Sequence, residues 1–434
     1  MKTLVGRTRT FERKEGLSQG TVEASALSSG NIGKGLEEYF GEVRLQPMSF
    51  LGDVSRMAAS RLAAQAGINL MQTIAETKLL SYHLDKSSFM VVGGPKVTEK
   101  LDAELENNPL MLCGQKMKRV TNYTYLGTVI SEVGVGESVT ESVKNKLGKV
   151  KHLIFEIKAV VESCKNNSPG AFLTSLLIWE SAVIPYLYHS SECWIEIPKK
   201  TLLALNSITE TFLRVMLACP KTTPKVAMYW EVGVQLPESI IMYNKLLFYF
   251  HIVHLGEETL AHKIYQEQKQ MNLGGGFVKE SLHALASLGI KEENVKTLSK
   301  VQFKKLVRER IKKKDKEELL IRMKNSKKFS FFSHKEEDFE TKPYFKTMKL
   351  QDSRTMFGIR SMTTQTIKTH QMSNNDFAKK LWQCECGATD TICHVKRCTL
   401  FEELRANLDI ENDDNDLVKY FQEVVRKRNA TQDE

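Results

Sequence analysis

Residues 137–161 read ESVTESVKNKLGKVKHLIFEIKAVV, and this stretch decides the fold class of the chain. Apolar residues recur in it at steps of four and three, which is the spacing of one face of an α-helix. The members of this apolar stripe are Val139, Val143, Leu147, Val150, Ile154, Ile157 and Val161. The stretch therefore predicts a long helix that buries one face against other elements.

The sequence downstream predicts further helices of similar quality at residues 171–188, 199–217 and 237–255. The tripeptide Ser168-Pro169-Gly170 ends the first long helix, and a proline at position 169 suits the first turn of the next one. Pro185 is expected to kink the helix that contains it, because proline cannot donate a backbone hydrogen bond. We therefore predict a helical domain over residues 132–290.

The upstream sequence mixes short β-like runs with one good helix at residues 57–82. A hairpin is expected at residues 45–54, and short strands are expected at 88–92 and at 123–130, where β-branched and aromatic residues gather. A polar connector separates these two strands. The whole chain is therefore predicted to be α+β, mostly α.

The charge of the chain is basic, with 62 Lys and Arg against 52 Asp and Glu and a net charge of +10. Such an excess favours polyanionic partners such as RNA or DNA. The first residues lack the apolar segment of a secretory signal, and no run reaches the apolar length of a membrane span. The sequence thus predicts an intracellular protein, nuclear or cytoplasmic, with no membrane association.

Most of the excess charge lies in residues 291–330, which contain 15 Lys and Arg against 6 Asp and Glu, an excess of 9. Contacts of lysine and arginine with phosphates bind nucleic acid without reading its sequence. The residues predicted to make such contacts are Lys304, Lys305, Arg308, Arg310, Lys312 and Lys313. A solvated, partly disordered linker or a nuclear import signal would be basic in the same way, so these interpretations stay open.

Cysteines crowd near the end of the chain, where Cys384, Cys386, Cys393 and Cys398 surround His394. Zinc prefers thiolate and imidazole ligands in a tetrahedron, so this cluster indicates a metal site rather than a disulfide framework. We predict Cys384, Cys386, His394 and Cys398 as the ligands of a structural zinc ion, with Cys393 as an alternative. The four other cysteines, Cys113, Cys164, Cys193 and Cys219, are predicted to be buried free thiols.

Several short motifs occur in an order that resembles the reverse transcriptases of non-LTR (LINE-type) retrotransposons. Leu17-Ser18-Gln19-Gly20-Thr21 resembles motif B, and Phe50-Leu51-Gly52-Asp53 stands where that family has the aromatic-x-Asp-Asp hairpin of motif C. Asp85-Lys86-Ser87 resembles the lysine region of motif D, and Tyr125-Leu126-Gly127 resembles the signature that precedes the thumb. The resemblance implies that residues 1–131 are part of a polymerase palm.

The resemblance continues to the C-terminal region. The thumb pattern of the family is matched by Glu180, Pro185, Tyr186, Tyr188, Glu192 and Trp194, and its zinc knuckle by the Cys/His cluster followed by Arg405. The resemblance implies a thumb-like domain at 132–290, a basic linker at 291–350 and a zinc-knuckle region at 351–434. It also implies that Gln19 and Gly20 contact template and nucleotide.

The catalytic chemistry of this family needs two Mg²⁺ ions, which are held by one aspartate of motif A and two of motif C. In this sequence glycine replaces the first motif C aspartate at position 52, only Asp53 remains, and no counterpart of motif A precedes residue 7. Lys86 would correspond to the general acid that protonates pyrophosphate. With too few carboxylates, we expect the chain to bind no magnesium and to catalyse no DNA synthesis.

Three interpretations of function follow from the sequence. The first is a fragment of a retrotransposon RNA-directed DNA polymerase, inactive as a nucleotidyltransferase, that retains affinity for RNA or DNA. The second is a non-enzymatic, helical nucleic-acid-binding protein. The third is the product of a pseudogene without function.

Overall fold

The computed structural model describes residues 48–50, 53–77, 82–93, 95–163, 168–221, 223–271, 275–325, 338–361, 363, 384–388 and 392–430. The fold is mostly helical with a few short strands, which confirms the predicted class at that level. The chain forms two compact units, Met1–Tyr123 with Ser131–Gly134, and Thr124–Ile130 with Val135–Glu434. We describe each unit separately.

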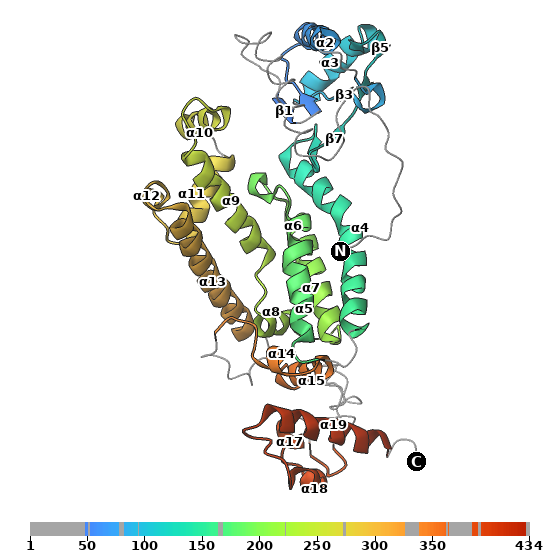
Figure 1. Cartoon of the computed structure of the whole chain (residues 1–434), viewed down its shortest axis with the longest axis vertical. Helices are drawn as coiled ribbons and strands as arrows, with labels where there is room; N and C mark the ends of the chain where they lie inside the picture. The colour runs from blue at the N-terminus through green and yellow to red at the C-terminus, as the bar shows by residue number, and fades with distance from the viewer. Residues whose placement is uncertain are drawn as a thin grey trace, which may run out of the picture. The chain divides into compact units, whose positions relative to one another are not determined.

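Among its described residues, the first unit combines the helices α2 (Arg61–Thr77) and α3 (Pro95–Asn107) with very short strands, at the blue end of the colour ramp in Figure 1. The predicted hairpin is present, because β1 (Met48–Phe50) pairs antiparallel with β2 (Asp53–Ser55). The remaining elements are η1 (Leu84–Lys86), β3 (Ser88–Phe89) parallel to β6 (Lys118–Arg119), and β4 (Met111–Leu112) antiparallel to β5 (Gln115–Lys116).

Two predictions for this part of the sequence were wrong. The expected polar connector contains α3, whose Leu105 contributes to a small core with Val91 and Leu110. The expected strand at 123–130 is a hairpin of β7 (Asn122–Tyr125) and β8 (Thr128–Ser131). Its turn has Leu126 at φ 49° and Gly127 at φ 78°, and two left-handed residues are what a two-residue hairpin turn needs.

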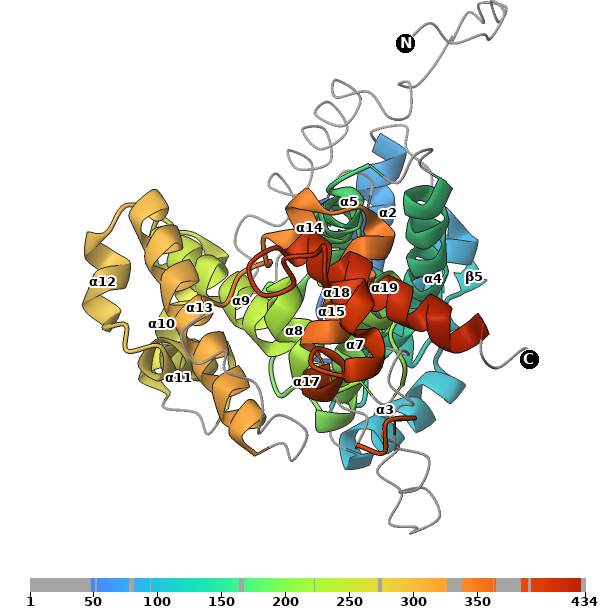
Figure 2. The same ribbon diagram turned by 90° about the horizontal axis from the view of Figure 1, so that it is seen from below.

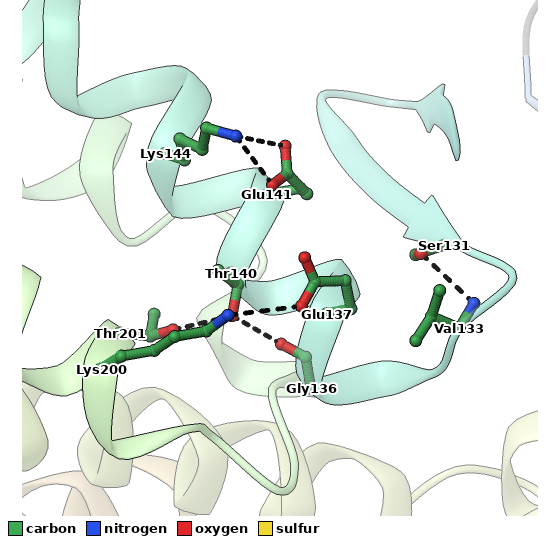
Figure 3. Close-up of polar contacts among 9 residues, drawn as sticks. All are labelled: Ser131, Val133, Gly136, Glu137, Thr140, Glu141, Lys144, Lys200 and Thr201. Atoms are coloured by element: carbon green, nitrogen blue, oxygen red, sulfur yellow. Dashed lines mark hydrogen bonds and ion pairs between the residues drawn. The ribbon is translucent and has the colours of Figure 1, made fainter. Parts of the chain in front are cut away.

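The helices predicted for the second unit are confirmed. They are α4 (Val135–Ser163), α5 (Ala171–Ile178) with α6 (Ile184–Leu187), α7 (Lys199–Leu217) and α9 (Pro237–Val253). Helix α8 (Lys225–Val232) was not predicted. All members of the apolar stripe of α4 are buried except Leu147, which is partly buried. The first turns of α4 and α7 meet through Thr140 and Thr201, whose hydroxyl oxygens are 2.9 Å apart, and Lys200 faces Glu137 at 3.6 Å (Figure 3).

The helix that contains Pro185 has a wider, π-helical turn before the proline. A π-helical turn, η2 (Trp179–Val183), joins α5 to α6. Proline at 185 cannot donate to the carbonyl of Ser181 and its ring collides with that carbonyl, so a wider turn relieves the clash. Trp179, in this turn, is fully buried and stacks on Phe212 at 4.1 Å.

The burial of single side chains follows from this packing. Trp179, Trp194 and Trp230 are buried in the core. Lys146 of α4 is 7% exposed and donates to the carbonyl of His189 at 3.1 Å. Its burial lowers the pKa of its ammonium group. Cys113 and Cys193 are exposed rather than buried thiols, whereas Cys164 lies outside the described residues.

A second core lies between α9 and four helices that follow it, which gather beside α9 in Figures 1 and 2. These helices are α10 (Leu260–Gln270), α11 (Phe277–Ser287), α12 (Glu292–Thr297) and α13 (Lys300–Lys324). Residues 300–324 of the predicted basic linker form a helix that buries every fourth residue, namely Phe303, Val307, Ile311, Asp315 and Leu319.

The C-terminal part of the chain completes the second unit. Its elements are α14 (Tyr344–Thr347), α15 (Leu350–Arg360), α17 (Ile392–Val395), η5 (Thr399–Phe401), α18 (Glu402–Arg405) and α19 (Asp414–Ala430). Helix α19 packs against α15, and Gln422 donates to Asp352 at 2.9 Å. Among the helices of the described residues, none is both long enough and apolar enough to span a bilayer.

A buried carboxylate fixes α13 to α9. Asp315 is fully buried, and its two oxygens accept from the Leu236 amide at 3.4 Å and the Ser239 hydroxyl at 2.5 Å. Both donors belong to the start of α9, where backbone amides lack partners within the helix. Burial raises the pKa of Asp315 to about 6 despite these hydrogen bonds. The charged form is therefore less favoured in the folded chain than in the unfolded one.

This pKa shift predicts a pH dependence of stability. A folded pKa raised above the unfolded value of 3.8 gives a stabilisation that is complete below pH 3.8 and lost as the pH rises through about 6. Relative to Asp315→Asn, the wild-type chain should therefore gain up to about 2 kcal/mol between pH 7 and pH 4. Urea unfolding of both proteins across this range measures the difference. Parallel stability curves for the two proteins would contradict it.

Candidate metal centre and nucleic-acid interface

Four potential metal ligands converge near the C-terminus. The ligand atoms of Cys384, Cys386, His394 and Cys398 all lie within 4.8 Å of one another. The sulfur of Cys398 is 3.7 Å from those of Cys384 and Cys386, and the sulfur of Cys386 is 3.2 Å from Nε2 of His394. All three cysteines are free thiols. The residues that the sequence predicted as ligands are therefore together in space.

These spacings match the size of a zinc coordination sphere. Zinc–sulfur bonds of about 2.3 Å in a tetrahedron place two sulfurs about 3.8 Å apart, and a sulfur and an imidazole nitrogen about 3.6 Å apart. The observed separations of 3.7 Å and 3.2 Å are close to both values. The cluster can hold one metal ion, and its soft donor set suits zinc.

The backbone conformation after Cys384 explains how residues close in sequence can meet in one cluster. After Cys384 the chain reverses in a turn in which the Gly387 amide donates to the Cys384 carbonyl at 2.8 Å. Gly387 has φ 86°, a left-handed conformation that favours glycine. Helix α17 then supplies His394. The adjacent Cys393, predicted as an alternative ligand, is exposed and is not part of this cluster.

Residues around the cluster hold its ligands in place. Arg405 donates to the carbonyl of Cys398 at 2.7 Å and to the Tyr420 hydroxyl at 3.3 Å. Tyr420 in turn donates to the carbonyl of Val395, next to His394. Cys384 and Cys398 also belong to the hydrophobic core that continues into the helical bundle. The ligand set is thus anchored to the fold and is not confined to a surface loop.

The electrostatics of the cluster favour a bound cation. A hydrogen bond from the Ala388 backbone amide is the main reason that the pKa of Cys386 is lowered. Burial raises the pKa of Cys398 to about 11. Several thiolates this close together repel one another, and Cys398 is only 2% exposed. A divalent ion would remove that repulsion and deprotonate the buried thiol.

The six basic residues predicted to bind phosphate all lie on α13. Lys304, Arg308 and Lys312 follow one another at steps of four, and Lys300 and Lys316 extend the same row at its two ends. Successive members of such a row lie on one side of a helix, about 6 Å apart along its axis. We call Lys300, Lys304, Arg308, Lys312 and Lys316 the basic row. Lys305, Lys313 and Arg310 are exposed on other faces.

Ion pairs neutralise part of the positive charge of the basic row. Lys312 pairs with Glu340, and Lys316 pairs with Asp338 at 3.1 Å. Sequence analysis missed both acids as partners, because 22 to 28 residues separate them from the lysines. Arg308 lies over the Tyr243 ring at 5.4 Å, and no acidic partner within the described residues contacts Lys300 or Lys304. Among the described residues, acidic side chains therefore neutralise only the carboxy-terminal members of the basic row, Lys312 and Lys316.

The polymerase-like positions are only partly described. Asp53 begins β2 and Lys86 ends η1, whereas Gln19, Gly20 and Gly52 lie outside the described residues. Within the part of the chain that the structure describes, the Cys/His cluster is the one group of three or more side chains that could hold a metal ion.

Comparisons with known proteins identify no relative. No family model, no curated protein and no solved structure matches the chain.

Proposed function

We propose that this chain is a nucleic-acid-binding protein derived from the reverse transcriptase of a non-LTR retrotransposon, and that it does not synthesise DNA. The observation that carries the binding proposal is the basic row, a line of cations that runs along α13 beside its buried stripe, with no acidic partner among the described residues at Lys300, Lys304 or Arg308. A helix anchored in a core presents its charges in a fixed arrangement. Binding then needs less ordering of the chain than a flexible basic linker would require.

The catalytic part of the proposal rests on missing carboxylates. Nucleotidyl transfer requires closely placed acidic ligands for two metal ions, and glycine at position 52 offers none. Asp53 alone cannot hold a metal pair. We expect purified protein to extend no primer on an RNA or DNA template, and extension that Asp53→Ala abolishes would overturn this part of the proposal.

We further propose that zinc is the metal of the Cys/His cluster. Three thiolates and one imidazole form a donor set that zinc binds in closed, structural sites. When bound, the ion cross-links the turn at Cys384 to α17 and Cys398. Its role in this proposal is to stabilise the C-terminal part of the fold.

Neutralising the basic row should weaken binding and reduce its salt dependence. We expect Lys304→Gln/Arg308→Gln to lower the affinity for a single-stranded oligonucleotide roughly tenfold at low salt. The slope of log affinity against log salt should fall by about 0.7 for each phosphate that the variant no longer neutralises. Fluorescence anisotropy across a salt series measures both quantities.

The matched control is Lys419→Gln/Arg426→Gln on α19, which removes the same charge from another exposed surface. We expect little change in this protein. Equal reductions of affinity in both variants would mean that net charge and not the basic row drives binding. Absence of measurable binding by the wild-type chain at low salt would overturn the proposed function itself.

A further inference from the structure

A pocket lies where the end of α9 meets the start of α13, two elements that lie side by side in Figures 1 and 2. Its volume is about 310 Å³, and its lining residues are Phe250, His251, His254, Leu298, Ser299 and Lys300. This volume is at the low end for small-molecule sites, so the pocket admits one ring system and not a large ligand. None of these lining residues is acidic.

The wall of the pocket is a column of stacked rings. The His254 ring stacks on Phe250 with centroids 4.1 Å apart, and Phe250 stacks on Phe303 at 4.8 Å. Phe303 is fully buried and Phe250 is 6% exposed, whereas His254 and His251 are exposed. A hydrogen-bonding contact of 2.9 Å between His254 Nδ1 and the Phe250 carbonyl holds the exposed imidazole against the column. The exposed His254 ring therefore ends a stack of aromatic rings whose other two members, Phe250 and Phe303, are buried.

The basic row begins at this pocket. Lys300 lines the pocket and is the first member of the row, and Lys304 and Arg308 follow at steps of one helical turn. Lys296, on the preceding helix, is also exposed. An aromatic face beside a track of cations is the combination that binds single-stranded nucleic acid, because bases stack while phosphates pair with the cations.

We propose that the pocket takes one unpaired base of a single-stranded nucleic acid, which stacks on His254, while Lys300, Lys304 and Arg308 hold phosphates of the same strand. The inference rests on the proposed nucleic-acid function and adds to it the class of ligand. A duplex cannot use the pocket, since its bases are already stacked and paired. RNA and DNA share the required chemistry.

The test compares a single-stranded oligonucleotide with an abasic phosphodiester strand of the same length and charge. Wild-type protein should bind the strand with bases roughly tenfold more tightly or better, since stacking of one base contributes on that scale. His254→Ala should bind both strands equally, and His254→Phe should restore the preference. His283→Ala, which alters an exposed histidine on α11, is the matched control and should behave as wild type.

The same assay distinguishes RNA from DNA as the ligand. It also separates failure of the pocket proposal from failure of the proposed function. RNA and DNA strands of one sequence show which sugar the site prefers, and a preference for either supports the inference. Equal binding of abasic and base-containing strands, still weakened by Lys304→Gln/Arg308→Gln, overturns the pocket and leaves the proposed function standing. A preference for bases that survives in His254→Ala also overturns it. Failure of the wild-type chain to bind any strand defeats the proposed function instead.

Discussion

Replacement of Cys384 or Cys398 by serine is expected to abolish metal binding and to unfold the C-terminal part of the second unit. Structural zinc contributes about 10–16 kcal/mol to the folding of small metal-dependent domains. Both cysteines are buried, with residue exposures of 7% and 2%, so an unliganded cluster leaves polar thiols without a compensating ion. Chelation of the metal should have the same effect on the wild-type chain as either substitution.

Metal content and proteolysis measure this effect together. Wild-type protein should contain one zinc per chain and resist cleavage over residues 392–430, whereas the serine variants should contain none and be cleaved there. Cys393→Ser is the matched control, because Cys393 is exposed and outside the cluster, and it should retain both metal and resistance. Metal-free wild-type protein with undiminished resistance to proteolysis would show that the cluster is not a metal site.

The Cys/His cluster could be predicted from sequence because few residue types bind zinc and their spacing is short. The exclusion of Cys393 from the cluster could not, since it depends on which way α17 faces. Neighbouring residues on a helix point about 100° apart, so only one of the two can face the other ligands. Tertiary packing of Val395 and Ile392 in the core determines which.

The secondary structure, too, could be predicted from the sequence only in part. The helix at 137–161 could be predicted because its apolar stripe continues over about six turns, whereas α3 could not. Only Leu101 and Leu105 of α3 contact its small core, and Val97 is 52% exposed, so the helical period is too sparse to detect. The turn of the β7–β8 hairpin was missed because Leu126, a residue typical of strands or helices, adopts a left-handed conformation there.

Helix α13 shows why composition alone misleads. Its buried residues are separated by three mostly charged residues each, so the stretch resembles a solvated linker when charge is counted. The pairing of Lys312 with Glu340 comes from chain segments that no local pattern connects. Sequence thus located the positive charge correctly, and the structure determines which cations are still available to a ligand.

Glu231→Ala is expected to destabilise the second unit by about 3–5 kcal/mol, the usual cost of leaving one partner of a buried ion pair uncompensated. Glu231 on α8 is fully buried, and its carboxylate accepts from Arg360 Nε at 2.7 Å and Nη2 at 3.2 Å. The Tyr344 hydroxyl donates to the same carboxylate at 3.0 Å. This one side chain therefore joins α8 to α14 and α15, and through α15 to α19, which packs beside the metal cluster.

Urea unfolding of the metal-bound protein measures the decrease in stability, and a second change shows its cause. If the uncompensated Arg360 is responsible, Glu231→Met/Arg360→Met should recover much of the stability, since apolar residues of similar volume can replace a buried ion pair. Glu423→Ala, which breaks the exposed pair with Arg426, should leave the unfolding curve unchanged. A double variant less stable than Glu231→Ala would mean that shape and hydrogen bonding at this junction, rather than the unpaired charge, determine the decrease.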